Sequence, residues 1–141
     1  MPAGLSISVT ETDPEYLGVE IRGWTNRYCG TTFVFAAPGE LTAAARSLEG
    51  FPSNADDERH FELGSSNERM ASGHCHVRVS QSDALGHLIV DVELIECDLR
   101  FPAASAAFQF RSEPGLIDGF ASQLSALEAA RHGLAELGMS G

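Results

Sequence analysis

The sequence predicts an α+β fold in which residues 1–141 form a single domain. Several short segments alternate apolar and polar residues, which is the period of a β-strand with one buried face. Two other segments repeat apolar residues at the spacing of an amphipathic helix. The order is strands, helix, strands, helix, which favours a mainly antiparallel sheet of about seven strands, with a sandwich-like arrangement among the options. At 141 residues the chain is long enough to bury a core without disulfides or metal.

The first three predicted strands lie at residues 5–9, 17–21 and 31–35. In the first two, apolar residues occupy every second position, and polar residues or glycine fill the positions between them. In the third, Thr31, Phe33 and Phe35 resume this alternation. Turn residues at 23–27 predict a hairpin with a wide connection between the second and third strands.

A short helix is predicted near residues 40–50. Its apolar residues recur at i, i+3, i+4 and i+7, and they are Leu41, Ala44, Ala45 and Leu48. Gly50 ends the pattern, as glycine commonly does just after a helix. After the loop that follows, we expect a brief strand with Phe61 and Leu63 facing the core.

Two adjacent strands are expected to pair as an antiparallel hairpin, and they span residues 75–79 and 88–94. Because apolar residues face apolar residues across the pair, the buried row also fixes the register of the outer row. The expected pairs are Val77 with Val92, Val79 with Val90, His76 with Glu93, and Arg78 with Asp91. By the same rule, Phe110 in the next strand faces Val92. Arg111 then lies beside Asp91.

The second helix is predicted near residues 114–137. Pro114 stands where the first turn of a helix tolerates proline, because its missing N–H would have no partner there. The apolar stripe comprises Leu116, Ile117, Phe120, Leu124 and Leu127, and it continues through Ala130, Leu134 and Leu137. Gly133 is expected to bend or interrupt this helix.

The chain is strongly acidic. Twenty Asp and Glu residues oppose nine basic residues, which gives a formal net charge of −11. This charge repels phosphate backbones and anionic lipids, which argues against nucleic acid and membrane surfaces as partners. It favours association with a basic protein, although acidity also serves solubility alone. No apolar run approaches the length of about 20 residues that spans a bilayer, and the N-terminus lacks the features of a signal peptide, so a cytoplasmic location is expected.

Two segments are candidate partner-binding sites. Trp24, Arg27 and Tyr28 lie in one predicted turn and belong to the residue types that dominate binding hot spots. The alternative is that Trp24 closes one end of the core. The second segment is an acidic loop that carries Asp56, Asp57 and Glu58. This loop either meets a basic partner or is a solvated loop and nothing more.

One histidine spacing suggests a metal site. His74 and His76 are alternate residues of a predicted strand, so both side chains lie on one face, where two imidazoles can bind zinc. A zinc site needs a third and usually a fourth ligand. The candidates for these ligands are His60, Glu62, His87 and Glu93. The alternative is that the histidines line a solvent-exposed face, with His76 beside Glu93.

Motifs for catalysis and nucleotide binding are absent from the sequence. The three cysteines, Cys29, Cys75 and Cys97, form no CxxC pair and are expected to be reduced and mostly buried. The sequence contains neither a glycine-rich phosphate loop nor a nucleophile elbow. We therefore expect a protein that binds no cofactor and is not an enzyme.

A series of core and turn segments follows along most of the chain. They are the strand that enters the Gly23-Trp24 turn, the helix end Leu48-Glu49-Gly50-Phe51-Pro52, the segment Phe61-Glu62-Leu63-Gly64-Ser65, the Gly73 to Val79 and Gly86 to Leu94 hairpin, and Phe108-Gln109-Phe110 followed by Leu116 to Leu124. In this order they resemble a group of small bacterial proteins that includes immunity proteins of the WapI type, the partners of wall-associated polymorphic toxins. The resemblance implies a cytoplasmic, non-enzymatic protein that binds a toxin domain and blocks its active site. It assigns no role to an individual residue, because these are fold positions.

These observations support three functional hypotheses. The first is an acidic protein-binding module, in its most concrete form an immunity-type inhibitor of a basic bacterial toxin domain. The second is a metal-dependent hydrolase or a metal-binding protein that uses His74 and His76. The third is a structural domain that associates with itself through exposed strand edges. The sequence leaves the oligomeric state open, a homodimer included.

Overall fold

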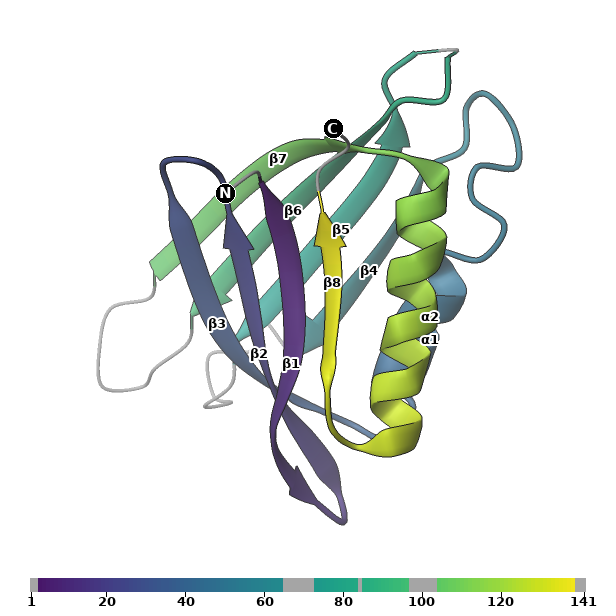
Figure 1. Ribbon diagram of the computed structural model, residues 1–141. Helices are drawn as coiled ribbons and strands as arrows, with labels where there is room; N and C mark the ends of the chain where they lie inside the picture. Colours follow the sequence, from purple (N-terminus) through teal and green to yellow (C-terminus); the bar gives the residue numbers. More distant parts are fainter. Residues whose placement is uncertain (1–2, 65–72, 84, 97–103, 139–141) are drawn as a thin grey trace.

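The computed structural model describes residues 3–64, 73–83, 85–96 and 104–138. In these ranges it has an α+β architecture with eight antiparallel strands in two four-stranded sheets, together with two helices (Figure 1). The elements are β1 (Gly4–Asp13), β2 (Tyr16–Trp24), β3 (Cys29–Ala36), α1 (Glu40–Ser47), β4 (Arg59–Gly64), β5 (His74–Gln81), β6 (Leu88–Glu96), β7 (Ala104–Ser112), α2 (Pro114–Ala130) and β8 (Leu134–Gly138). The predicted fold class is confirmed.

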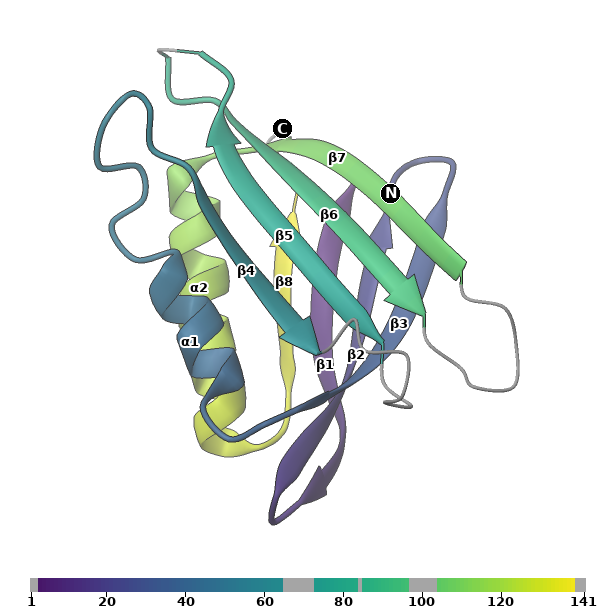
Figure 2. The ribbon, with the colours of Figure 1, turned by 180° about the vertical axis from the view of Figure 1, so that it is seen from behind.

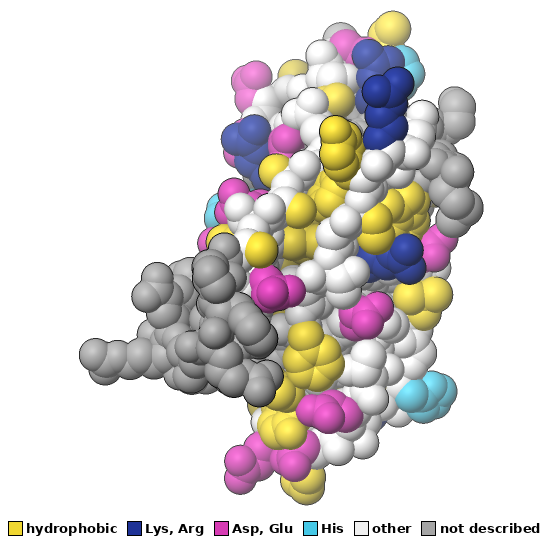
Figure 3. All heavy atoms as spheres, turned by 90° about the vertical axis from the view of Figure 1, so that its left-hand side faces the viewer, with side chains coloured by type: hydrophobic (Ala, Val, Ile, Leu, Met, Phe, Trp, Pro, Cys, Tyr) yellow, Lys and Arg dark blue, Asp and Glu magenta, His cyan; other side chains and the backbone are white. Residues whose placement is uncertain are grey.

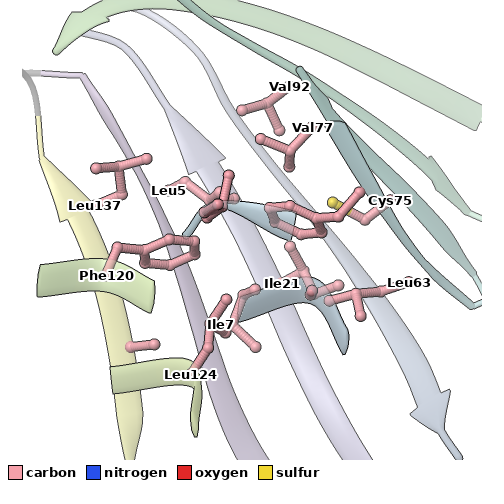
Figure 4. Close-up of a cluster of buried hydrophobic side chains, with 14 of the residues drawn as sticks. Leu5, Ile7, Ile21, Leu63, Cys75, Val77, Val92, Phe120, Leu124 and Leu137 are labelled. Atoms are coloured by element: carbon pink, nitrogen blue, oxygen red, sulfur yellow. The ribbon is translucent and has the colours of Figure 1, made fainter. Parts of the chain in front are cut away.

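The two sheets face each other through their apolar rows. The strand order is β3-β2-β1-β8 in the first sheet and β4-β5-β6-β7 in the second. The two helices lie side by side, α2 against β8 and α1 against β4 (Figures 1 and 2). Figure 4 shows the centre of the core, where Ile7 and Ile21 of the first sheet meet Leu63 and Val77 of the second, with Phe120 of α2 beside them. Neither helix in the described ranges is long and apolar enough to cross a membrane.

The predicted register of the central hairpin is confirmed, but the register of the strand after it is wrong. Val77 faces Val92 and Arg78 faces Asp91, as expected. In β7, however, Phe108 rather than Phe110 faces Val92. Asp91 therefore lies opposite Gln109, whose Nε2 donates a hydrogen bond to Asp91 Oδ1 at 2.8 Å, and Arg111 lies opposite Ile89. A shift of two residues keeps the same row of side chains on the core face, so alternation alone cannot distinguish the two registers.

The second helix is shorter than predicted. It ends at Ala130, and the segment expected to continue it as far as 137 forms β8, which pairs with β1. The backbone turns here because Arg131 and Gly133 have positive φ angles of 60° and 114°. In β8, Ala135 and Leu137 are buried whereas Leu134 is 54% exposed, which is the period of a strand. This segment is the eighth strand, which the sequence pattern did not predict.

In β3 the aromatic row faces outward. Thr32, Val34 and Ala36 point into the core, whereas Phe33 and Phe35 are 37% and 38% exposed. The reason is that β3 lies close to the second sheet, where the Thr32 hydroxyl donates to the carbonyl of Ile95 at 2.8 Å. Only small side chains fit on the inner face of a strand that approaches its neighbours so closely.

Candidate functional site

An exposed cluster of aromatic and acidic side chains lies on the outer face of the first sheet. We call it the aromatic-acidic patch and define it by Glu11, Tyr16, Glu20, Phe33 and Phe35. Strand pairing brings these residues together, because Phe33 lies opposite Glu20 and Phe35 lies opposite Gly18. A register shift between Val9 and Glu11 places Glu11 on the other side of Gly18. Such a bulge re-aims the side chains that follow it.

The aromatic rings of the patch pack edge to face. The ring centroids of Tyr16 and Phe35 are 4.8 Å apart, and those of Phe33 and Phe35 are 5.1 Å apart, with interplanar angles of 71° and 84°. Gly18 makes room for this cluster, since a Cβ atom there would lie 2.5 Å from Cγ of Glu11 and 2.9 Å from Cζ of Phe33. The rings are thus held in fixed positions while one edge of the cluster stays open to solvent.

The carboxylates of the patch are not neutralised within the part of the chain that the structure describes. Glu11 and Glu20 are exposed, and neither forms an ion pair with a described residue. Partial burial, the charges of Glu11 and Asp13, and a hydrogen bond to Glu11 raise the pKa of Tyr16 above its ordinary value. The Tyr16 hydroxyl therefore remains protonated and keeps its donor. The patch is an apolar surface with a negative rim.

Figure 3 shows the face on which β3 lies. Hydrophobic side chains form a band along this face, and in its described part the Arg side chains lie in the upper and middle parts of the view, with Asp and Glu side chains among them. At the lower end the hydrophobic side chains have only acidic neighbours of the charged types. The β1–β2 turn, which lies beside the patch, and the β2–β3 turn lie at opposite ends of the first sheet (Figure 1).

The predicted residues Trp24, Arg27 and Tyr28 lie at the turn between β2 and β3. Tyr28 is 73% exposed, and the backbone N–H groups of Arg27 and Tyr28 both donate to the Thr25 hydroxyl. The Trp24 ring packs over Gly4, where a Cβ atom would lie 2.6 Å from its Cζ2. Beside it is a shallow cavity of about 320 Å³ that is lined by Ser6, Arg22, Trp24, Thr25, Cys29 and Glu136. A role of these residues in binding remains a prediction.

The predicted acidic loop lies on the opposite side of the molecule from this turn (Figures 1 and 2). Within the loop, Asp57 has an internal role, because both of its oxygens lie 2.9 Å from guanidinium nitrogens of Arg59 and it also accepts hydrogen bonds from Ser53. Glu58 lies 3.6 Å from Arg78, and Asp56 is exposed. The structure therefore does not join the two predicted binding segments into one surface, and the partner-binding role of the loop remains a prediction.

We expect Asp57→Asn to lower the thermal unfolding midpoint at neutral pH. The hydrogen bonds from Arg59 and Ser53 hold the pKa of Asp57 well below its usual range. Its ionised form therefore stabilises the fold fully above the ordinary carboxyl pKa of about 4, and this contribution is lost as the pH falls below that value. The difference in midpoint between wild type and variant should narrow at acidic pH. Asp56→Asn is the matched control, and an equal loss in the two variants would contradict this role of Asp57.

The fold brings several potential metal ligands to the outer face of the second sheet but does not make them converge. His76 faces Glu93 and Glu62 across the strands, and its ring centroid lies 5.6 Å from that of His60. The Nε2 atom of His74 is 3.5 Å from a carboxylate oxygen of Glu62. His87 lies elsewhere, with its Nδ1 atom 2.8 Å from Asp83. Over the described ranges, no group of three or more His, Cys, Asp or Glu side chains could hold a metal ion, and the metal-dependent alternative gains no support from the geometry.

The two described cysteines differ in their environment. Cys75 is buried in the core, and burial raises the pKa of its thiol to about 12. This agrees with an unreactive thiol. Cys29 is exposed, contrary to the expectation of burial, and the Nε atom of Arg22 donates a hydrogen bond to its sulfur at 3.1 Å. Cys97 lies outside the described residues.

The aromatic-acidic patch is not predicted by the sequence pattern. The alternation of Thr31, Phe33 and Phe35 indicates an apolar row, and such rows normally face a core. One signal could have found them, because Val34 and Ala36 make the other face of β3 apolar as well. A strand that is apolar on both faces either is buried on both or exposes one of them.

Comparisons with known proteins assign the chain to no family. No protein-family model matches it, and neither a curated protein nor a solved structure is significantly similar to it.

Proposed function

We propose that this protein is a non-enzymatic, acidic protein-binding module that binds a basic partner through the aromatic-acidic patch. The observation that carries the proposal is an exposed edge-to-face aromatic cluster surrounded by carboxylates that have no ion-pair partner among the described residues. Large aromatic side chains supply much of the binding energy at protein interfaces, and surrounding charges select the partner.

Each part of the patch has a separate physical role in this proposal. Phe33 and Phe35 lose their remaining exposed area on binding, which is favourable because apolar surface leaves water. Glu11 and Glu20 attract a cationic surface and speed association, an effect that salt screens. Because Tyr16 and Phe35 are already in contact, little side-chain freedom remains to be lost when the partner docks.

In its most concrete form, we propose a cytoplasmic immunity-type inhibitor of a basic bacterial toxin domain. The resemblance to WapI-type immunity proteins points to this class. The net charge of −11 agrees with it, because domains that act on nucleic acid are commonly basic. Among the candidate surfaces, the patch suits a basic partner better than the Trp24 turn, since Arg22 and Arg27 would repel such a partner there.

The test is a binding measurement with the protein encoded by the neighbouring reading frame, because an inhibitor is usually encoded beside its target. We expect wild type to bind with a salt-dependent association rate. The double variant F33T/F35T should weaken binding by about tenfold or more, as removal of central aromatic side chains does at interfaces. The double variant E11Q/E20Q should mainly slow association and flatten its salt dependence.

The matched control is Tyr28→Thr, which removes an exposed aromatic side chain at the β2–β3 turn. It should leave the affinity unchanged. If Tyr28→Thr abolishes binding while F33T/F35T does not, the Trp24 turn is the binding surface and the patch is not. Threonine suits β-strands, and circular dichroism would verify that the variants remain folded.

A further inference from the structure

At three of the four sheet edges, a backbone group in the described ranges bonds to another part of the chain. At the edge of β8, the Glu136 N–H donates to the side-chain oxygen of Gln123 in α2 at 2.7 Å. At the edge of β4, the Gly64 N–H donates to Glu40 of α1 at 2.8 Å. At the edge of β3, the carbonyl of Phe33 accepts a hydrogen bond from the Gly73 N–H at 2.7 Å.

The fourth edge, the outer edge of β7, has no such cover among the described residues. No backbone hydrogen bond joins it to a described segment other than β6, and a 3.4 Å bond from the Ser112 hydroxyl to Gly138 lies at its end. The strand is nine residues long, contains neither proline nor a register shift against β6, and carries one charged residue, Arg111. Natural sheets normally block an exposed edge with proline, bulges, short strands or charged side chains, and of these β7 has only the single arginine. An unblocked edge of this length is a template for another strand.

We propose that β7 pairs antiparallel with β7 of a second copy of this chain. A two-fold axis at the middle of β7 would join the second sheet of one copy to the second sheet of the other, which makes one continuous eight-stranded sheet. Such a contact is isologous, so each edge satisfies the other and no edge is left to propagate into a fibre. In the register that pairs all nine residues, the axis passes through Phe108, and the outer-row pairs are Ser105 with Arg111 and Ala107 with Gln109.

Charge favours a second copy over a basic partner at this edge. Each copy carries a net charge of −11, so two copies can approach only through a strip without carboxylates. The strand β7 is such a strip, because its only charged residue is Arg111. In the fully paired register Arg111 faces Ser105 of the second copy, so no like charges oppose each other. A basic partner would find no carboxylate on this strand.

The proposed dimer is independent of the proposed function. The dimer uses the edge of the second sheet, whereas the aromatic-acidic patch lies on the outer face of the first sheet. The variant F33T/F35T should therefore leave self-association unchanged, and variants of β7 should leave the patch intact. Failure of one proposal can be distinguished from failure of the other.

Sedimentation velocity of the full chain over a range of concentrations tests the proposal. We expect a reversible monomer-dimer equilibrium. Hydrogen exchange should locate the interface, because the amides of β7 should exchange more slowly at concentrations where the dimer dominates. This readout does not depend on the register of the pairing.

Two substitutions of the exposed Ser105 form a matched pair. Ser105→Arg places two arginines opposite each other at two symmetric positions and should weaken the dimer several-fold, up to about tenfold. Ser105→Glu places a carboxylate opposite Arg111 at the same positions and should strengthen it by a similar factor. A monomer at every concentration would overturn the proposal. So would a dimer in which the exchange of β7 amides is unchanged, or whose affinity does not move in opposite directions in the two variants.

Discussion

Replacing Phe120 by alanine is expected to lower the free energy of unfolding by about 3–5 kcal/mol. Phe120 is 1% exposed and is among the largest fully buried side chains of the described residues. It projects from α2 into the space between the sheets, with its ring centroid 6.4 Å from that of Phe61 (Figure 4). The substitution removes buried apolar surface and leaves a cavity that strands fixed by hydrogen bonds cannot fill. A domain of this kind is stable by only about 5–15 kcal/mol, so the loss is a large share of the total.

Urea unfolding followed by circular dichroism measures this loss. Leu116→Ala is the matched control, because Leu116 lies on the same helix but is 39% exposed. We expect it to cost about 1 kcal/mol or less, since most of its surface remains in contact with water. Equal losses in the two variants would contradict the prediction, because burial of the Phe120 ring would then contribute no more than a half-exposed residue of the same helix.

Alternation of apolar residues predicted the central hairpin down to individual pairs. The strands β5 and β6 are joined by a short turn that limits how far one can shift against the other, so one register pairs their buried rows. The register of the buried row also sets the register of the outward-facing row. It places Arg78 opposite Asp91, and their side chains are 3.4 Å apart. The alternation of apolar residues is therefore sufficient to predict the register of two strands when they are adjacent in sequence and the turn limits their relative shift.

The alternation of apolar residues does not predict the register, the buried row or the type of element where contacts between distant segments decide them. The position of β7 could not be predicted because a shift of two residues buries the same row. In β3 both rows are apolar, and the close approach of the second sheet selects the row with small side chains. The segment 134–138 satisfies a helical period together with the residues before it and a strand period on its own. Pairing with β1 decides in favour of the strand.

The candidate site was harder to predict than the fold. The patch is assembled from β1, β2 and β3, and it depends on the bulge before Glu11 and on the outward orientation of Phe33. The bulge has no signal in residue spacing. Besides the two apolar rows of β3, Gly18 is a clue in the sequence, because a glycine within a strand often marks a close approach, here that of the Glu11 side chain and the Phe33 ring.

Gly73→Ala is expected to destabilise the protein by about 3 kcal/mol, at the upper end of what overpacking costs. Gly73 lies where the first sheet meets the second, and its N–H donates to the carbonyl of Phe33. A Cβ atom there would lie 1.8 Å from the Thr32 hydroxyl oxygen and 2.8 and 3.0 Å from the backbone oxygens of Ile95 and Phe33. The hydroxyl can rotate away, but the two backbone oxygens belong to strands and cannot. Relief would require β3 to separate from the second sheet, which should be visible as a lower urea midpoint.

A second glycine tests whether the loss at Gly73 is steric. Gly119 lies inside α2, and no atom outside its immediate neighbourhood lies within 4 Å of a Cβ atom added there. Gly119→Ala should therefore stabilise the protein by about 0.5–1 kcal/mol, because alanine restricts the unfolded chain and favours a helix.

Adding T32A to Gly73→Ala should recover only part of the lost stability, since the backbone contacts remain. Full recovery would show that the Thr32 hydroxyl alone sets the distance between the sheets. No loss in Gly73→Ala would mean that the sheets can separate at β3 without cost, and the outward orientation of Phe33 and Phe35 would then need another cause.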